Sequence, residues 1–431
     1  MYCGFIVEIA ELHKHSNADR LQCVEVFGNN VIVDLSYKEG QKCVFFPVDG
    51  QLNEEFAKKN NLLRIKDADG NYTGGYMDPD KRNIKAIRLR GEKSEGLLLP
   101  VESLSDYTNI SELQIGDKIT ILNGVEICKK YIPPRKNTAR KSSNSNSKSK
   151  NSNQINFPIF KEHSDTEQLM YNKSAFHEGD RCIITLKMHG TSARTANSIE
   201  DKTYPKKWYH KMFGKNPRMV RQWKMVSGTR RVVLDNFDDG SGYYGNNAFR
   251  KPYHDFFSGK LEKGEEIFYE IVGYVDEKTP IMGSVSTSKL KDKELKKLYG
   301  DTMVFSYGCK EGESDIYVYR MTMTNEDGHV VEYPDWLMRL RCEQMGVKCV
   351  PKFDEFTFTT WEDLMERVEK YYDGPDPIGG THCREGVVVR IENREKFKAY
   401  KHKNFTFKLV SGLISETINT DNMSEDMLSE L

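Results

Sequence analysis

The sequence predicts two folded domains of different class, a small all-β barrel followed by a larger domain that holds both strands and helices. Residues 1–134 show short apolar runs separated by turn signals, a pattern typical of a small barrel. Residues 135–156 are nearly all Ser, Asn, Lys and Arg, so they cannot bury a core and are predicted to be a flexible linker. Residues 157–431 return to a mixed composition, with two helical patterns between residues 335 and 372.

Composition restricts the functional classes. At 431 residues the chain is long enough for two or three domains. Its 64 basic and 64 acidic side chains cancel, so a nucleic-acid surface would have to come from local patches. No apolar run of membrane-spanning length and no signal peptide is present, which predicts a cytoplasmic protein with no membrane partner. None of the nine cysteines has zinc-finger spacing, so buried reduced thiols are expected.

The barrel prediction depends on seven candidate strands. They are residues 2–9, 20–27, 31–35, 42–48, 84–89, 95–99 and 118–122. Residues 53–80 are rich in Asn, Asp, Gly and Lys, and are interpreted as an insertion between strands. Residues 15–21 and 89–97 resemble landmarks of the tRNA-binding OB fold attached to some synthetases. The alternative interpretation is that both phrases only close a five-stranded barrel and contact no base.

The first chemical signal in the larger domain is a lysine at the end of an apolar strand. Residues 182–186 are β-branched and apolar, as in a buried strand, and Lys187 follows them directly. A partly desolvated lysine beside other cations becomes a usable amine nucleophile. Gly190 would let a ligand or loop approach the backbone. Taken alone, the stretch also fits a solvated lysine followed by a glycine turn.

Further polar residues interrupt the apolar strands downstream. Glu270 lies inside the run 265–273, where a carboxylate is costly unless it is paired, hydrogen-bonded or holding a metal. Glu385 precedes a glycine and a β-branched strand, and could hold a divalent cation. Lys401 and Lys403 are two residues apart on one strand, so both point at one anionic site. Arg230 lies at a strand edge, where simple surface charge is the alternative.

In this order the motifs resemble those of the covalent nucleotidyltransferases, the superfamily of ATP-dependent DNA and RNA ligases and mRNA capping enzymes. His189 stands where the DNA ligases have aspartate, and the stretch is similar to the lysine-x-histidine-glycine form of phage-type RNA ligases. Residues 157–168 resemble the segment that covers the nucleotide. The resemblance spans residues 157–410 and implies an α+β nucleotidyltransferase domain with antiparallel sheets, preceded by an OB-fold barrel.

The resemblance also implies roles for individual residues. The catalytic residues would be Lys187, Lys401 and Lys403. The nucleotide-binding residues would be Leu186, His189, Gly190, Arg230, Glu270 and Tyr307, with the Tyr307 ring stacked on the purine. The metal ligands would be Glu385 and Glu270. For Tyr307, the alternative is a core aromatic on a strand, which is the commoner role of such residues.

A basic stretch between these motifs is the candidate nucleic-acid surface. Residues 202–231 contain ten Lys or Arg, interleaved with aromatic residues. Cations contact phosphates and aromatic faces stack on bases, although core packing of any one aromatic is equally open. The residues chosen are Lys206, Lys207, Lys211, Arg218 and Arg221.

The implied reaction is RNA ligation with ATP and Mg²⁺ or Mn²⁺. A lysyl-AMP forms, AMP moves to a 5′-phosphate, and a 3′-hydroxyl RNA end displaces it, at nicks in duplexes. Only 21 residues follow Val410, too few for the C-terminal OB domain of DNA ligases and capping enzymes. RNA is the expected partner, a DNA template strand stays open, and a monomer is expected. The alternatives are a DNA ligase, a GTP-dependent capping enzyme, or a non-catalytic RNA- or tRNA-binding protein.

Overall fold

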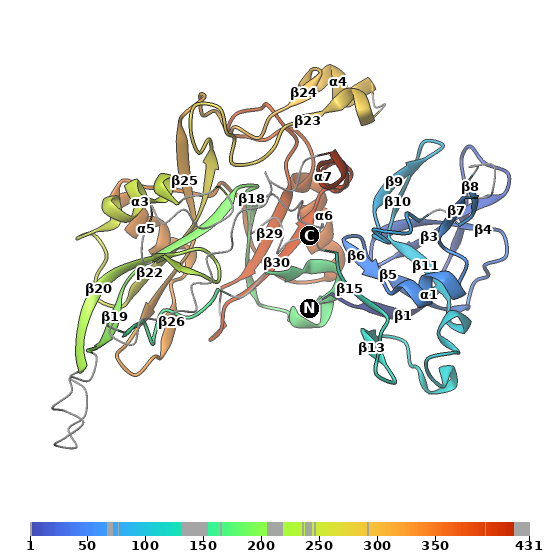
Figure 1. Ribbon diagram of the computed structural model, residues 1–431, viewed down its shortest axis with the longest axis horizontal. Helices are drawn as coiled ribbons and strands as arrows, with labels where there is room; N and C mark the ends of the chain where they lie inside the picture. The colour runs from blue at the N-terminus through green and yellow to red at the C-terminus, as the bar shows by residue number, and fades with distance from the viewer. Residues whose placement is uncertain are drawn as a thin grey trace. The chain divides into compact units, whose positions relative to one another are not determined.

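The computed structural model describes residues 2–66, 72–75, 77–131, 154–163, 166–204, 219–234, 237, 244, 247–290, 293–392 and 394–417. Their contacts divide the chain into two compact units. Unit 1 contains residues 2–131 together with residues 404–417, and unit 2 contains residues 154–403 (Figure 1). Among the described residues, no helix is long and apolar enough to cross a membrane.

Unit 1 is built mainly from short antiparallel strands. Its largest sheet has the spatial order β11 (Leu97–Pro100), β5 (Lys42–Phe46), β1 (Gly4–Glu8), β12 (Lys118–Ile119). A second sheet contains β2 (Leu12–Lys14), β3 (Leu21–Val26) and β4 (Asn29–Asp34). The remaining strands form the pairs β6 (Gly50–Leu52) with β15 (Cys128–Lys130), β7 (Arg64–Lys66) with β8 (Tyr72–Gly74), β9 (Ala86–Leu89) with β10 (Glu92–Glu95), and β13 (Ile121–Leu122) with β14 (Val125–Glu126). Each of the seven predicted runs contains an observed strand.

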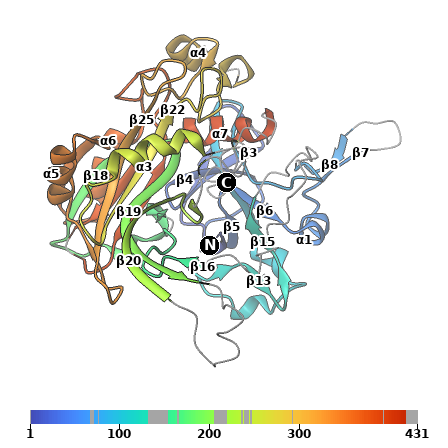
Figure 2. The same ribbon diagram turned by 60° about the vertical axis from the view of Figure 1, so that its left-hand side comes forward.

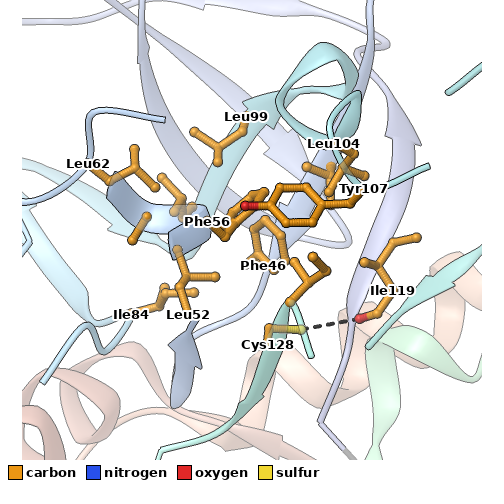
Figure 3. Packing of buried hydrophobic residues seen from close by; sticks show 14 of the residues in the cluster. Phe46, Leu52, Phe56, Leu62, Ile84, Leu99, Leu104, Tyr107, Ile119 and Cys128 are labelled. Carbon is orange, nitrogen blue, oxygen red and sulfur yellow. Dashed lines mark hydrogen bonds between the residues drawn. The ribbon is translucent and has the colours of Figure 1, made fainter. Parts of the chain in front are cut away.

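The segment expected to be an insertion is part of the core. Asn53 caps helix α1 (Glu54–Lys59) by accepting the N–H of Glu55 at 2.9 Å. The cap directs the Phe56 ring inward, where its centroid lies 5.8 Å from that of Phe46 and 5.7 Å from that of Tyr107 (Figure 3). Leu62, Leu63 and Met77 are buried in the same cluster. Residues 53–80 do lie between β6 and β9, but they also contribute to the core, because a few apolar side chains within the polar composition face inward.

Two short loops that the sequence singled out meet in unit 1. His15 is buried, and its Nε2 lies 3.1 Å from the carbonyl oxygen of Leu89. The Asn17 amide donates to the Arg90 carbonyl at 3.3 Å. These hydrogen bonds join residues 15–21 to residues 89–97, so the two phrases have a structural role in closing the barrel.

The helix after the last strand of unit 2 belongs to unit 1. Helix α7 (Phe405–Thr417) carries Lys408, whose Nζ lies 2.7 Å from Glu95 Oε1. The same Nζ donates to Asn29 Oδ1 at 3.3 Å, and the Lys93 ammonium lies 4.9 Å from the centre of the Phe405 ring. The predicted second domain, residues 157–431, therefore loses its C-terminal helix to unit 1.

Unit 2 contains two large sheets. The first has the order β21 (Val233–Leu234), β20 (Met219–Gly228), β19 (Thr191–Thr203), β22 (Glu265–Gly273), β25 (Ser314–Thr324), β26 (Val330–Glu332). Strand β16 (Gln154–Asn156) joins it antiparallel to β19, and β27 (Lys348–Cys349) joins it parallel to β25. Since residues 154–156 form a strand, the predicted linker 135–156 ends too late. Residues 132–153 lie outside the described residues.

The second sheet carries the strand ends that matter for function. Its order is β17 (Glu167–Gln168), β30 (Lys398–Lys403), β29 (Gly386–Ile391), β18 (Arg181–Lys187), β28 (Lys352–Thr357). Helix α6 (Trp361–Tyr372) lies against β29 and β30. Its residues Leu364 and Val368 belong to the same buried cluster as Ile184, Val387 and Tyr400 of the sheet. Figure 2 shows the helix beside this part of unit 2. Helix α5 (Asp335–Met345) confirms the other predicted helix.

The remaining elements of unit 2 are short. They are α3 (Lys251–Phe257), α4 (Lys293–Tyr299), and the strand pair β23 (Val285–Ser286) with β24 (Thr302–Met303). All strand pairings of the two large sheets are antiparallel except β17 with β30 and β25 with β27. The predicted mixture of helices with largely antiparallel sheets is therefore observed in the described part of unit 2.

Candidate active site

Three adjacent strand ends define the candidate site. Gly386 opens β29, and its Cα partners are Lys187 on β18 and Lys403 on β30. Side chains directly opposite each other in an antiparallel sheet project from the same face. The two lysines therefore project together on either side of a residue without a side chain, although they are far apart in sequence.

A single buried carboxylate lies between these lysines. Glu385 is 1% exposed, and its Oε1 lies 2.7 Å from Lys187 Nζ and 3.5 Å from Lys403 Nζ. Its Oε2 lies 3.7 Å from His189 Nδ1. A buried carboxylate is costly unless it is paired, and here it faces two cations and an imidazole. Lys401 is buried two residues before Lys403, so the strand ends carry more positive than negative charge.

Two glycines allow the close packing around the site. Gly386 has a φ of +146°, and a Cβ there would lie 2.0 Å from the His402 carbonyl oxygen. At Gly190 a Cβ would lie 2.4 Å from the carbonyl oxygen of Ile271 and 2.8 Å from Glu270 Cγ. The close approach predicted at Gly190 is thus made by β22 of the protein itself, and it brings the Glu270 side chain next to the turn that follows Lys187.

His189 is fixed by two aromatic residues. Its backbone N–H donates to the Tyr307 hydroxyl at 2.6 Å, and its ring meets that of Phe305 edge-on, with centroids 4.9 Å apart. Tyr307 is 3% exposed and has a φ of +50°. Burial raises the pKa of its hydroxyl well above the usual value. Tyr307 therefore supports the turn after Lys187 from within the protein, and the stacking of its ring on a purine stays a prediction.

Leu186 and Arg230, two further candidates, are both buried. Leu186 is buried, and its N–H donates to the Pro351 carbonyl at 2.9 Å, so its side chain packs in the core. Arg230 is also buried, and its carbonyl accepts the N–H of His163 at 3.0 Å. This hydrogen bond ties the end of β20 to the segment 157–163, which the sequence placed over the nucleotide.

Sequence reasoning missed a buried arginine beside this segment. Arg194 on β19 donates to the Thr229 carbonyl at 3.0 Å and to Glu266 Oε1 at 3.0 Å. Its guanidinium lies 3.7 Å from the centre of the Phe160 ring. Burial raises the pKa of the Glu266 carboxyl to about 7, opposed by Arg194. The sequence does show a basic residue in the strand that follows Lys187. It does not show which residues Arg194 contacts, because its partners are far away in the chain.

A second missed arginine holds the start of β19. Arg250 donates from Nη2 to Thr191 Oγ1 at 2.7 Å and from Nη1 to the Ser192 carbonyl at 3.0 Å. Ser192 is also the Cα partner of Glu270 across the sheet. Arg250 therefore fixes the strand beside Glu270. It lies just before α3, where nothing in the sequence indicated a contact with the region around Lys187.

The candidate nucleic-acid residues are mostly beyond the described residues. Lys206, Lys207, Lys211 and Arg218 lie in residues 205–218, outside them. Arg221 lies on β20, where its guanidinium donates to both carboxylate oxygens of Asp201, at 2.7 and 2.8 Å. A phosphate would have to compete with this ion pair for Arg221.

The carboxylates at the site could supply only some of the oxygen ligands that a divalent cation needs. The described residues contain no group of three or more His, Cys, Asp or Glu side chains that could hold a metal ion. Mg²⁺ is commonly held by one or two carboxylates together with substrate phosphates and water. Glu385 and Glu270 are two carboxylates near the turn that follows Lys187.

Comparison with known families identifies the first part of the chain. A family model described as an OB-fold domain matches residues 4–101. Residues 4–101 form an OB-fold domain. This match confirms the barrel prediction, and it includes the hydrogen bonds that join the two loops around His15 and Leu89. No curated protein matches the chain.

Solved structures share the fold over most of the chain. A Naegleria gruberi RNA ligase mutant with AMP and Mn is 17% identical, with a TM-score of 0.56 over 94% of this chain and 97% of that one. A mutant of the same ligase with ATP and Mn gives 17% and 0.56 over 94% and 98% of the chains. An apo mutant gives 17% and 0.57 over 94% and 97%. The chain therefore has the fold of an RNA ligase with an amino-terminal OB domain.

Proposed function

We propose that this protein is an ATP-dependent RNA ligase that joins a 3′-hydroxyl RNA end to a 5′-phosphate end, at nicks in duplexes. The observation that carries the proposal is the placement of Lys187, Glu385 and Lys403 at three adjacent strand ends. A nucleophilic lysine, a proton acceptor and a second cation in one place are what attack on a nucleotide phosphate requires. The shared fold with an RNA ligase supports the same reaction class.

In the first step the Lys187 amine attacks the α-phosphorus of ATP. A P–N bond forms, the bond to the β-phosphate oxygen breaks, and pyrophosphate leaves. The lysine must first lose a proton, and Glu385 Oε1 lies 2.7 Å from Nζ, within reach to accept it. Lys401 and Lys403 lie on the neighbouring strand, where their charges would stabilise the negative charge that develops on the phosphates.

A divalent cation fits this step. Glu385 and Glu270 would hold Mg²⁺ or Mn²⁺ together with the nucleotide, and the ion would neutralise phosphate charge and orient the leaving group. Because Glu385 contacts Lys187 in this structure, cation and lysine would compete for the same carboxylate. Glu385 would pass the Lys187 proton to solvent before it binds the cation, so that the neutral Lys187 amine is free to attack.

The later steps need no further catalytic group, but they require that the two polynucleotide ends be aligned. A 5′-phosphate oxygen attacks the phosphorus of lysyl-AMP and releases Lys187. The 3′-hydroxyl then attacks the activated 5′-phosphate, a phosphodiester bond forms, and AMP leaves. The rate depends on holding both ends in line. We infer that the OB domain and residues 202–231 bind the nucleic acid, and that the protein acts as a monomer.

The first experiment follows the covalent nucleotide. The purified protein is incubated with Mg²⁺ or Mn²⁺ and with α-labelled ATP or GTP, then separated on a denaturing gel. Label from ATP on the wild type and on Lys173→Ala, but not on Lys187→Ala, is expected, since Lys173 is an exposed lysine of the same unit. Label from GTP alone would favour a capping enzyme. No label with either nucleotide would favour a non-catalytic RNA-binding protein.

The second experiment identifies the polynucleotide. Nicked duplexes that differ only in the sugar of the 3′-hydroxyl nucleotide are ligated with ATP, on either an RNA or a DNA template strand. Sealing of the ribose end in preference to the deoxyribose end is expected. Equal sealing of both ends would contradict the RNA specificity and favour a DNA ligase.

A further inference from the structure

A buried histidine to which the sequence assigned no role lies near the site. His382 is 0% exposed, and its ring packs against Phe305, with centroids 4.8 Å apart, and edge-on against Tyr307, at 4.4 Å. Its Nδ1 lies 2.9 Å from the Cys383 carbonyl oxygen. A carbonyl can only accept, so Nδ1 carries the proton and the ring orientation is fixed.

The loop that covers His382 holds it from the other side. Asp376 is buried, and one carboxylate oxygen accepts the N–H groups of Ile378 and Gly379, both at 2.9 Å. The Asp376 N–H donates to the His382 carbonyl at 2.8 Å. The same carboxylate oxygen lies 3.9 Å from His382 Nε2, beyond hydrogen-bonding distance. Within the described residues Nε2 has no hydrogen-bond partner, so packing and the backbone, more than a polar contact at Nε2, fix the ring.

Both aromatic residues that touch His382 also touch His189. The Tyr307 hydroxyl accepts the His189 N–H, and the Phe305 ring meets the His189 ring edge-on. His189 in turn lies two residues after Lys187 and 3.7 Å from Glu385. Contacts therefore lead from His382 through Phe305 and Tyr307 to His189, and from His189 to Glu385. His382 and Glu385 are also close along the backbone, since only two residues separate them.

We propose that His382 is a positioning residue for the transfer of the nucleotide to Lys187. Its ring is the common support of Phe305 and Tyr307, and through them it sets the position of the turn that carries His189 relative to Glu385. The proposal assumes the function proposed above. It predicts that loss of the flat ring slows formation of the covalent adduct, because displacement of a reacting group by about 1 Å is enough to cost large factors in rate.

The kinetic test compares variants that differ in ring and volume. His382→Leu fills the space without a ring, and His382→Phe keeps the ring. In single-turnover adenylylation at saturating ATP, the Leu variant should be about tenfold or more slower than wild type, and the Phe variant within about threefold. Val368→Ala, a buried substitution on α6, is the control and should lower thermal stability without changing the rate. A Leu variant at the wild-type rate, or a folded Phe variant as slow as the Leu variant, would overturn the proposal.

A double-mutant cycle tests the route. Tyr307→Phe removes only the hydroxyl that accepts the His189 N–H. If His382 acts through Tyr307, the His382→Leu and Tyr307→Phe effects on the adenylylation rate should be less than multiplicative. Fully multiplicative effects would show that His382 and Tyr307 act independently, which contradicts the proposed action of His382 through Tyr307.

A final measurement does not require activity. In the ¹³C,¹⁵N-histidine-labelled protein, the His189 ring resonances are assigned with His189→Gln and compared between variants. His382→Leu should shift them, because the Phe305 ring next to His189 loses its support, and Val368→Ala should not. Unchanged His189 resonances in a folded Leu variant would overturn the inference. Failure of the wild type to form an adduct would instead refute only the proposed ligase function.

Discussion

The lysines at the site differ in what they can do. Lys187 Nζ is 2.7 Å from Glu385 Oε1, a hydrogen-bonding distance, whereas Lys403 Nζ is 3.5 Å from the same oxygen. Lys187 is therefore placed to exchange a proton with Glu385 and to become the amine nucleophile. In the proposed reaction, Lys403 would attract the phosphates that arrive beside Glu385.

Removal of the Lys403 charge should slow adenylylation and leave the fold intact. We expect Lys403→Ala to lower the rate by about 10²-fold, the usual cost of losing one preorganised charge at a transition state. The measurement is the rate of label transfer from ATP at saturating nucleotide. Lys398→Ala is the matched control, since this exposed lysine lies on the same strand. A Lys403→Ala variant as fast as the control would remove Lys403 from the mechanism.

His163 should make stability depend on pH. Burial lowers the pKa of its imidazole well below 6.5, reinforced by the Arg320, Arg230 and Arg194 cations. The folded pKa lies below the unfolded one, so the stability it contributes is complete above pH 6.5 and is lost as the pH falls through the folded pKa. Relative to His163→Gln, the free energy of unfolding of the wild type should fall by about 1.4 kcal/mol per pH unit below 6.5.

Urea unfolding of both proteins between about pH 7.5 and 5.5 measures this difference. His13→Gln, at an exposed histidine, is the control and should follow the wild type. If the free energy of unfolding changed with pH in the same way for the wild type and for His163→Gln, protonation of the buried imidazole would not destabilise the fold.

Residue chemistry could be read from the sequence only where a polar group interrupts an apolar strand. Lys187 follows an apolar run and Glu385 precedes one, so their strands were predictable. The convergence of these two residues with Lys403 was expected only from the resemblance to the nucleotidyltransferases. Arg194 and His382 were not predictable, because their importance comes from partners far away in the chain. Arg194 meets Glu266, 72 residues later, and His382 meets Phe305 only after the loop around Asp376 folds over it.

At the scale of elements, the central strand of the smaller sheet depends on one glycine. Gly386 combines a positive φ with a backbone that leaves no space for a side chain. Gly386→Ala should destabilise unit 2 by about 3 kcal/mol or more, because β29 and β30 would have to separate. Gly259→Ala is the control for the φ effect alone, since Gly259 has a φ of +78° in open space, and should cost about 1 kcal/mol.

Chemical denaturation gives both values. If the two alanine variants lower the free energy of unfolding by the same amount, the clash of the added Cβ with the His402 carbonyl oxygen does not contribute to the destabilisation. In that case the close approach of the strands would not explain why a glycine stands between the two lysines.

Elements with strong periodicity were predictable, and elements with weak patterns were not. The strands around residues 4–8, 42–46 and 182–186 are short apolar runs, so local sequence determines them. Helix α1 has only six residues and carries mostly charged side chains. Its place is decided by Phe56, whose burial against Phe46 and Tyr107 is a tertiary contact that no local pattern specifies.

At the scale of the whole molecule, the chain passes from one unit to the other and back. Strand β30 ends at Lys403 in unit 2, and residue 404 already belongs to unit 1. A boundary drawn from composition could locate the Ser/Asn/Lys segment, but it could not reveal this return, because α7 carries no compositional break. The return means that β30, which carries Lys401 and Lys403, is covalently continuous with a helix of the OB-containing unit.

The two units should therefore unfold in separable thermal transitions, and α7 should follow the first unit. In differential scanning calorimetry, Phe56→Ala should lower one midpoint, since a buried phenylalanine contributes about 3–5 kcal/mol, and Leu364→Ala should lower the other. Lys408→Ala breaks the ion pair with Glu95 and should cost about 2 kcal/mol in the transition that Phe56→Ala shifts. A Lys408→Ala effect confined to the transition of Leu364→Ala would instead return α7 to unit 2.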